Sequence, residues 1–414
     1  MLSRHMFRGI YMRQKTEPDN ADNNASIECG KLNGTLTTVD FGTTSVSNIL
    51  YVLFRQQDYH SGGAPHVCSE FWVIWYSYWG DTNPHIWGDN QPGQKHDLAL
   101  YKSNIEAMFY QANASWSQYM IHGGTNFAWN AGATGQLAGI TTSYDYAAAI
   151  SEDGDTTDTY FALRDLISNI SGWENKPLAV PPNNTKTNYG PVTLTRIGTN
   201  LVSTLTRIQE TCVSSKDPLS FEQINHGYGF VLYTTTLKAG GNTLSTPNLR
   251  DHGFVYLNNV YLGWLLRDNT TTININAKPG DTLRILVENR GRNPAETPDS
   301  KGLNVQARLA WGLRGNGNVT LDGALLQDWF QCGINLTKAS VDSLTTTFLE
   351  EELVEESVPE KAASQPGFYV GTFTANTLAD TFFDSRAYAL HGTSNLAYVM
   401  IGIYTKTTCL PEVF

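Results

Sequence analysis

One carboxylate, Glu70, lies near the start of the most aromatic stretch of the chain, "HVCSEFWVIWYSYWGD" (residues 66–81), ahead of its tryptophans and tyrosines. A carboxylate buried among rings costs several kcal/mol unless it is paired or hydrogen-bonded. Glu70 is therefore either a surface residue at a strand end, as most glutamates are, or a charge that the protein uses. The stretch by itself leaves both interpretations open.

Two later stretches also contain residues that could line a site. "HGGTNFAWNAGA" (122–133) has two glycines that allow close approach of the backbone, and its Asn126 offers hydrogen-bond donors. "TTSYDYAAAISEDG" (141–154) places Tyr144, Asp145 and Tyr146 side by side. Taken alone, the first is typical of a Gly-rich turn and the second of tyrosines packed on a strand.

The surrounding elements have the pattern of parallel βα units. Short β-branched runs predict strands, and apolar residues at helical spacing predict helices, in the order strand 35–42, helix 45–57, strand 66–71, helix 97–115, strand 117–124 and helix 156–170. Asp97 is a suitable N-cap for the second helix. That helix should bury Leu98, Tyr101, Ile105, Met108 and Ala112, and the third should bury Tyr160, Leu163, Ile167 and Ile170. In barrels of such units the active site lies where the strands end.

The pattern changes after a Pro-rich stretch. Runs at 228–237, 253–266, 271–277 and 281–289, separated by Asn-Asn and Pro-Gly-Asp turns, predict an antiparallel β-sandwich. The expected domains are an irregular segment at 1–30, a partial barrel at 31–172, a Pro-rich linker at 173–191, a β-sandwich at 192–340 and an incomplete or divergent second β domain at 341–414.

Composition excludes several classes of protein. The 414-residue chain has a net charge of -11 and no basic cluster, so no nucleic acid partner is expected. No run approaches 18 apolar residues, so no membrane span is expected. The five cysteines are scattered without zinc spacing, which leaves one or two disulfides open and predicts neither a metal nor a cofactor. Neutral ligands such as sugars stay open as partners, and the aromatic content of 11% is compatible with sugar binding.

Eight Asn-x-Ser/Thr triplets are candidate glycosylation sites and mildly favour a secretory route: Asn24, Asn33, Asn113, Asn169, Asn183, Asn269, Asn318 and Asn335. The first residues, "MLSRHMFRGIYMRQK", lack the apolar core of a signal peptide.

Three motifs together resemble one family. "SEFWVIWYSYWGD", "YMIHGGTNFAWNAGA" and "TSYDYAAAISEDGDTTDTYFALRDLI" follow one another as in the acid β-galactosidases of glycoside hydrolase family 35. The similarity covers residues 29 to 290 and continues more weakly to about 373. It implies the C-terminal part of a (β/α)8 barrel followed by jelly-roll-like β-sandwich domains.

The resemblance also implies a function. Glu70 matches the nucleophile that forms a galactosyl-enzyme in a retaining, double-displacement hydrolysis of terminal β-galactose. Trp75 matches a ring that packs on the sugar, Tyr119 a tyrosine near the nucleophile, and Tyr144 and Tyr146 residues that contact galactose. Phe71 and Trp79 are assigned to packing. The implied partners are β-galactoside glycans, and the implied location is lysosomal or extracellular.

One component of that mechanism is missing. The family's acid/base is the Glu of an Asn-Glu pair after the fourth barrel strand, and the chain contains no Asn-Glu pair. Retaining glycosidases need both carboxyl groups. We therefore expect this chain to be the downstream part of a longer β-galactosidase. Two alternatives are a galactoside-binding homologue without activity and a fragment that does not fold.

Overall fold

A computed structural model of the chain describes residues 36, 38–57, 63–74, 97–127, 129, 132–134, 138–145, 147–198, 200–266, 270–291, 319–350, 354–355, 367–377 and 379–381. The chain divides into two compact units. Unit 1 comprises Met1–Asn126 and Ser143–Lys186, and unit 2 comprises Phe127–Thr142 and Thr187–Phe414. Residues 127–142 thus group with unit 2, although both of their ends join unit 1. The predicted domain boundaries stay a prediction.

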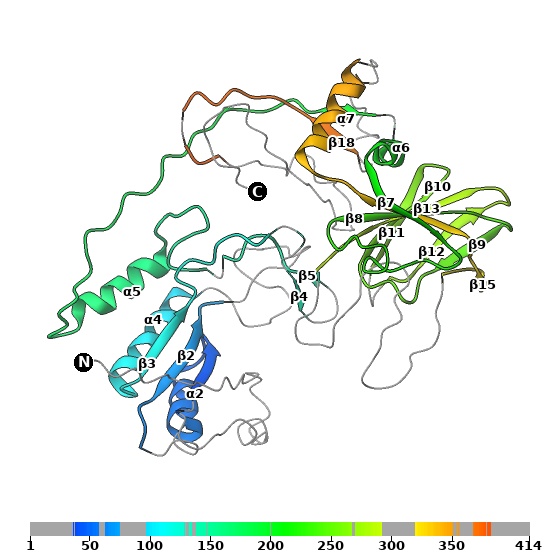
Figure 1. Cartoon of the computed structure of the whole chain (residues 1–414). Helices are drawn as coiled ribbons and strands as arrows, with labels where there is room; N and C mark the ends of the chain where they lie inside the picture. The colour runs from blue at the N-terminus through cyan, green and yellow to red at the C-terminus, as the bar shows by residue number, and fades with distance from the viewer. Residues whose placement is uncertain are drawn as a thin grey trace, which may run out of the picture. The chain divides into compact units, whose positions relative to one another are not determined.

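Unit 1 contains a parallel sheet covered by helices (Figure 1). Strands β1 (Val39–Gly42), β2 (Val67–Trp72) and β3 (Ser115–Tyr119) lie in that order, and both pairings are parallel. Helix α2 (Val46–Tyr51) continues as the π-helix η1 (Val52–Gln57), and α4 (Leu98–Glu106) continues as η2 (Ala107–Gln111). Helix α5 is Asp158–Asn169. The predicted order of three βα units is confirmed.

Aromatic and aliphatic side chains form the core between this sheet and its helices. The Phe71 ring stacks on Tyr101 with centroids 6.0 Å apart and meets Phe41 edge-on at 5.8 Å. Phe71 is therefore a packing residue, as predicted. The predicted face of α4 and η2 is also confirmed, because Tyr101, Ile105, Met108 and Ala112 are buried and Leu98 packs against them. Asp97 caps α4 by accepting the Leu100 N–H.

The predicted face of α5 is wrong by about one position within the helix, whereas Ile170 is buried as predicted. The buried stripe is Thr159, Ala162 and Leu166, with Ile170 just beyond the helix. Tyr160, Leu163 and Ile167 are only half-buried. Thr159 and Ala162 are small, so a helix that faces the core through them can approach its neighbours closely. The larger apolar side chains then cover the margins of the contact.

Unit 2 is built around two antiparallel sheets. The six-stranded sheet has the order β11 (Val260–Leu266), β10 (His252–Leu257), β13 (Thr282–Glu288), β8 (Phe230–Thr236), β16 (Trp329–Ile334) and β7 (Gln209–Ser215). The second has the order β12 (Thr272–Ala277), β9 (Gly241–Ser245), β14 (Thr320–Leu321) and β15 (Ala324–Leu325). All four predicted β-rich runs are confirmed as strands. At the predicted Asn258-Asn259 turn both residues have positive φ.

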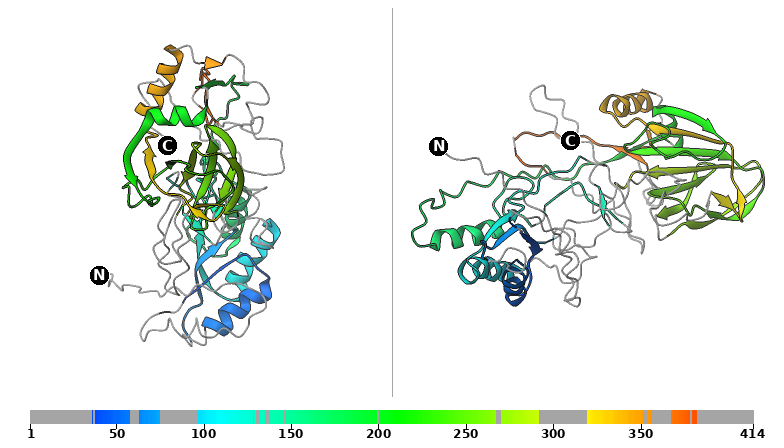
Figure 2. Two further views of the ribbon diagram at one scale, coloured as in Figure 1. Left: turned by 90° about the vertical axis from the view of Figure 1, so that its right-hand side faces the viewer. Right: turned by 60° about the horizontal axis from the view of Figure 1, so that its bottom comes forward.

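Both faces of the six-stranded sheet are covered by apolar residues. One face shares a core with the second sheet, where Val231, Val255 and Ile285 meet Leu244 and Ile275. The other face packs on residues of α6 (Leu201–Leu205), the 3-10 turn η4 (Thr206–Ile208) and α7 (Lys338–Glu350). Helix α7 lies beside one end of the strands (Figure 2). No helix was predicted at 338–350.

A third, small sheet follows the order β17 (Val354–Glu355), β6 (Thr195–Ile197) and β18 (Phe368–Val370). Strand β6 precedes the strands of the two larger sheets in the sequence, and β17 and β18 follow them. Unit 2 also contains a short hairpin, β4 (Ala133–Thr134) with β5 (Ala138–Gly139), which belongs to its 127–142 part. Within the described ranges, no helix has the length and apolar character needed to cross a membrane.

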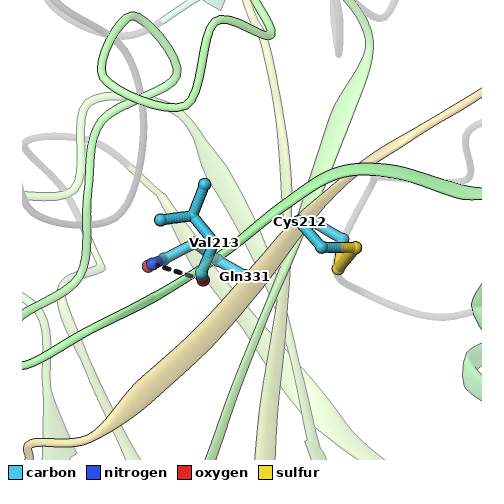
Figure 3. The surroundings of a disulfide bond; sticks show 4 residues. Cys212, Val213 and Gln331 are labelled. Carbon is cyan, nitrogen blue, oxygen red and sulfur yellow. Dashed lines mark hydrogen bonds between the residues drawn. A yellow bond between two sulfur atoms is a disulfide. The ribbon is translucent and has the colours of Figure 1, made fainter.

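The structure resolves part of the cysteine pairing. Cys212 on β7 is bonded to Cys332 on β16, 120 residues later (Figure 3). Between the same strands the buried Gln331 donates through Nε2 to the Val213 carbonyl oxygen at 3.0 Å. Cys68 is a buried free thiol. Cys29 and Cys409 lie outside the described residues.

Candidate active site

A change of register in β2 determines where Glu70 lies. The pairing with β3 shifts between Cys68 and Phe71, and the pairing with β1 shifts at Val39 and Asp40. Cys68 and Phe71 are both fully buried in the helix-covered core, although they are three residues apart. The two residues between them are half-buried. Bulges of this kind often re-aim side chains beside active sites.

Asp40 lies directly beside Glu70 in the pairing of β1 with β2. Its carboxyl group is buried and accepts a 2.5 Å hydrogen bond from the Ser69 hydroxyl, which also contacts the Thr38 hydroxyl at 2.7 Å. Burial raises the pKa of Asp40, and the hydrogen bonds from Ser69 and the Glu70 backbone partly oppose this. The candidate nucleophile thus has a second acidic residue as its partner in the sheet register.

Two tyrosines predicted for the site are in contact. The hydroxyl groups of Tyr119, at the end of β3, and Tyr144 are 2.8 Å apart, and their rings meet edge-on. Tyr119 pairs with Trp72, two residues after Glu70, in the sheet register. The two tyrosines therefore lie close to the carboxyl end of β2 rather than in separate parts of the unit.

The Gly-rich turn makes the close backbone approach that its sequence predicts. A Cβ atom added to Gly123 would lie 1.5 Å from the Tyr144 carbonyl oxygen, so no side chain fits there. Gly124 has a φ of +77° and its carbonyl oxygen accepts the Tyr144 N–H at 3.0 Å. The turn therefore positions the backbone of Tyr144 against that of residues 123 and 124.

A loop that contains Glu152 also contacts this turn. Glu152 accepts a hydrogen bond from the Thr125 hydroxyl, and its carbonyl oxygen contacts His122 Nε2 at 3.3 Å. Ile150 donates to the Ile121 carbonyl oxygen at 2.7 Å, and Ile150 pairs in parallel with His122. An isolated parallel bridge therefore joins residue 150 to the chain just after β3.

Several predicted residues lie outside the described residues. Trp75, Tyr146 and Trp79 are among them, as are the glycosylation candidates Asn24, Asn33, Asn269 and Asn318. Of the described candidates, Asn113 and Asn169 are exposed. Asn183 accepts hydrogen bonds from Thr156, and Asn335 Oδ1 accepts the Thr337 N–H at 3.0 Å. The Asn183 side chain thus joins two segments 27 residues apart, whereas that of Asn335 holds a local turn.

Comparison with known families covers both units. A family model described as "Glycosyl hydrolases family 35" matches residues 4–170, which include the whole candidate site. A second, "Beta-galactosidase, first all-beta domain", matches residues 218–335. The chain belongs to glycosyl hydrolase family 35.

Named members of family 35 show the same relationship. The chain is 36% identical to the human "Beta-galactosidase" over 310 residues, 73% of this chain and 42% of the human protein. It is 32% identical to the Bos taurus "Beta-galactosidase" over 377 residues, 87% of this chain and 53% of that protein. The Mus musculus "Beta-galactosidase-1-like protein" is 32% identical over 367 residues, 86% and 51% of the two chains. The chain thus spans about half the length of the curated relatives it matches.

Sequence reasoning missed Asp40 and Ser69. Asp40 ends a predicted strand in "VDFG", as Glu70 ends the next, and this position was a usable signal. Ser69 gave no signal, because its role depends on the bulge that turns it toward Asp40. For a family 35 glycosidase, the arrangement offers one carboxylate at the end of a strand together with tyrosine hydroxyls that can donate to an anion or a sugar oxygen.

Proposed function

We propose that Glu70 is the nucleophile of a retaining β-galactosidase and attacks the anomeric carbon of a terminal β-galactosyl group. The carboxylate would form a galactosyl-enzyme, and water would then hydrolyse it with overall retention. The observation that supports this most is the position of Glu70 at a bulge of β2, two residues before Trp72, whose sheet partner Tyr119 contacts Tyr144, in a chain of family 35.

We also propose the remaining roles by resemblance. Trp75 would pack on the galactose ring, Tyr119 would keep the nucleophile ionised, and Tyr144 and Tyr146 would contact the sugar. The parallel sheet would be the C-terminal part of a (β/α)8 barrel, and the two antiparallel sheets a jelly-roll-like sandwich. The common core of those two sheets and the parallel pairings of β1, β2 and β3 support this.

The compartment is part of the proposal. A lysosomal or extracellular location would suit both the Cys212–Cys332 disulfide, since disulfides persist in oxidising compartments, and the exposed sequon residues Asn113 and Asn169. The partners would be β-galactoside glycans of glycoconjugates.

A second candidate function rests on the acid/base group. The sequence contains no Asn-Glu pair to match that of the family. Loss of a general acid typically slows a reaction by about 10²–10⁴-fold. A chain without that group would bind galactosides with little or no turnover of unactivated substrates.

The experiment that separates the two candidates uses an aryl β-galactoside with an activated leaving group, which needs little protonation. Glu70→Gln should abolish its hydrolysis in an enzyme, and a fluorosugar galactoside should label Glu70 covalently. The matched control is Glu106→Gln, an exposed Glu on α4 that should leave turnover unchanged. Galactose binding without turnover in the unmodified chain would favour the binding protein. Equal turnover in the Glu70→Gln variant would reject Glu70 as the nucleophile.

A further inference from the structure

The bulge in β2 decides on which face of the parallel sheet Glu70 lies. Between Cys68 and Glu70, β2 contains one residue more than the facing part of β1, and between Cys68 and Phe71 it contains one more than the facing part of β3. Side chains alternate between the two faces of a strand, so a regular strand would place Glu70 on the same helix-covered side as Cys68. The bulge places Phe71 on that side instead, and Glu70 is half-buried.

The carboxyl group of Asp40 binds both residues of this bulge. Asp40 pairs with Glu70 in the register of β1 and β2 and is only 4% exposed. Its Oδ1 accepts the Ser69 hydroxyl at 2.5 Å, and the carboxyl group also accepts the Glu70 backbone N–H. The Ser69 hydroxyl is 2.7 Å from the Thr38 hydroxyl. One buried carboxyl group therefore joins the side chain of Ser69 to the backbone of the candidate nucleophile.

Two further side chains bind the carbonyl groups of the bulge. Cys68 Sγ donates to the Glu70 carbonyl oxygen at 3.4 Å, and burial raises the pKa of this thiol to about 12, so it keeps its proton. Gln118 Nε2 on β3 donates to the Phe71 carbonyl oxygen at 3.3 Å, and Gln118 Oε1 accepts the Tyr101 hydroxyl at 2.9 Å. Side chains thus bind both the N–H and the carbonyl oxygen of Glu70.

A buried acid at position 40 costs desolvation free energy that an apolar residue would not. Its neighbours Val39 and Phe41 belong to the buried apolar core under the helices. Alternation along β1 therefore places Asp40 on the other face of the sheet, as the bulge does for Glu70. The cost and the position of Asp40 are both explained if its carboxyl group serves the geometry of Glu70.

We propose that Asp40 is a positioning residue for Glu70: its carboxyl group holds the Ser69–Glu70 bulge and so sets the direction of the Glu70 carboxylate. The benefit to catalysis rests on the proposed function, in which a Glu70 carboxylate oxygen must approach the anomeric carbon in a defined direction. The hold on the bulge does not rest on that function, and hydrogen exchange measures it without any sugar.

Four variants of the full chain separate positioning from general stability. Asp40→Ala removes the acceptor, and Ser69→Ala removes one of its donors. Ser69→Thr keeps the hydroxyl group and should retain the bulge. The matched control is Asn104→Ala, because Asn104 is also buried in unit 1 and holds the Thr44 backbone through two hydrogen bonds, at 2.9 Å and 2.7 Å.

The first readout is covalent labelling of Glu70 by a fluorosugar galactoside with an activated aryl leaving group. Glu70 forms an ester with the anomeric carbon while the aryl oxide departs with the electron pair of the broken bond. The limiting rate constant should fall at least about 10-fold in Asp40→Ala and about 3-fold in Ser69→Ala, with the half-saturating concentration changed by less than about 3-fold, because misplaced reacting atoms slow the step more than they weaken binding. Ser69→Thr and Asn104→Ala should be labelled at the unmodified rate, even where Asn104→Ala lowers the melting temperature.

The second readout is hydrogen exchange of the Glu70 backbone amide. This amide should exchange at least about 10-fold faster in Asp40→Ala than in Asn104→Ala, because only the first substitution removes its acceptor.

Either readout can overturn the proposal. Labelling of Asp40→Ala at the unmodified rate, an equal loss of rate in Asn104→Ala, or unchanged exchange of the Glu70 amide in Asp40→Ala would each reject it. If Asp40→Ala does not fold, the comparison of Ser69→Ala with Ser69→Thr decides by the same readouts. Absence of label at Glu70 in the unmodified protein would reject the proposed function, and exchange of the Glu70 amide would then decide by itself whether Asp40 holds the bulge.

Discussion

The Ser69 hydroxyl donates to Asp40 Oδ1 across the first two strands of the parallel sheet, one residue before Glu70. The bond satisfies a buried carboxyl group at the bulge that places the candidate nucleophile. The geometry of Glu70 therefore depends on a neighbouring acid that takes no part in the proposed chemistry.

Ser69→Ala should lower the free energy of unfolding by about 1–3 kcal/mol at neutral pH, because the ionised Asp40 loses a buried donor. Burial raises the pKa of Asp40. The folded protein therefore binds this proton more tightly than the unfolded chain does. The stability that results is present below the ordinary pKa of an aspartate and is lost as the pH rises through the raised pKa of Asp40. Urea denaturation at neutral and acidic pH measures both effects.

The control for Ser69→Ala is the same substitution in an Asp40→Asn background. The neutral amide has no charge to stabilise, so the loss should shrink and its pH dependence should disappear. An equal loss in both backgrounds would show that Ser69 acts by packing alone.

Gly123→Ala should disrupt the Gly-rich turn. Its Cβ atom would overlap the Tyr144 carbonyl oxygen, and the obstacle is backbone, which cannot rotate away. We expect a loss of at least about 2 kcal/mol in stability or displacement of the turn. Gly227→Ala is the matched control, because its Cβ atom would meet nothing within 4 Å and should change stability by about 0.5 kcal/mol or less. Thermal denaturation compares the two, and similar melting temperatures would contradict the close approach.

Removal of the Cys212–Cys332 disulfide should destabilise unit 2. The bond closes a loop of 120 residues between the edge strand β7 and its neighbour β16. Loops of that length predict a loss of about 2–5 kcal/mol. Urea unfolding of the Cys212→Ser/Cys332→Ser variant measures the loss.

The unmodified protein in dithiothreitol should unfold at the same urea concentration as this variant, and Cys68→Ala should keep its sensitivity to the reductant because Cys68 forms no disulfide. A reductant effect that persists in the double variant would point to another disulfide.

The stability difference between the unmodified protein and Glu288→Gln should depend on pH. Burial raises the pKa of Glu288 to about 7, above its ordinary value near 4.5, so the folded state holds the proton more tightly. Stability from this group is present below about pH 4.5 and is lost as the pH rises through about 7. The Gln variant should gain on the order of 3 kcal/mol relative to the unmodified protein between pH 4.5 and 8.

His252 works in the opposite direction, because burial lowers its pKa and it destabilises the fold at acidic pH. Because His252 Nδ1 lies 3.8 Å from Glu288 Oε2, the two contributions are coupled, and the difference is measured by urea denaturation in a His252→Gln background. A difference that stays constant from pH 5 to pH 8 would mean that Glu288 is ionised throughout this range in the folded protein.

Local patterns predicted most of the elements around the site. The helical spacing from Leu98 to Ala112 predicted the buried face of α4, and the Asn258-Asn259 turn predicted the hairpin of β10 and β11. These features depend on residues that are close in the sequence, so the local spacing of residue types is enough to predict them. The face of α5 was mispredicted, since large apolar residues are not always the ones that fit closest to the core.

The sequence by itself determined the family motifs and the βα order, and it predicted Glu70 as the nucleophile. Only the tertiary structure decided that Ser69 turns to Asp40, that Gly123 lies against Tyr144, that Cys212 pairs with Cys332 and that Trp129 reaches Glu288. Each of these contacts joins residues that are 20 to 160 positions apart. Their partners are selected by sheet register and by which backbone comes within van der Waals distance, and neither is encoded in the local spacing of residue types.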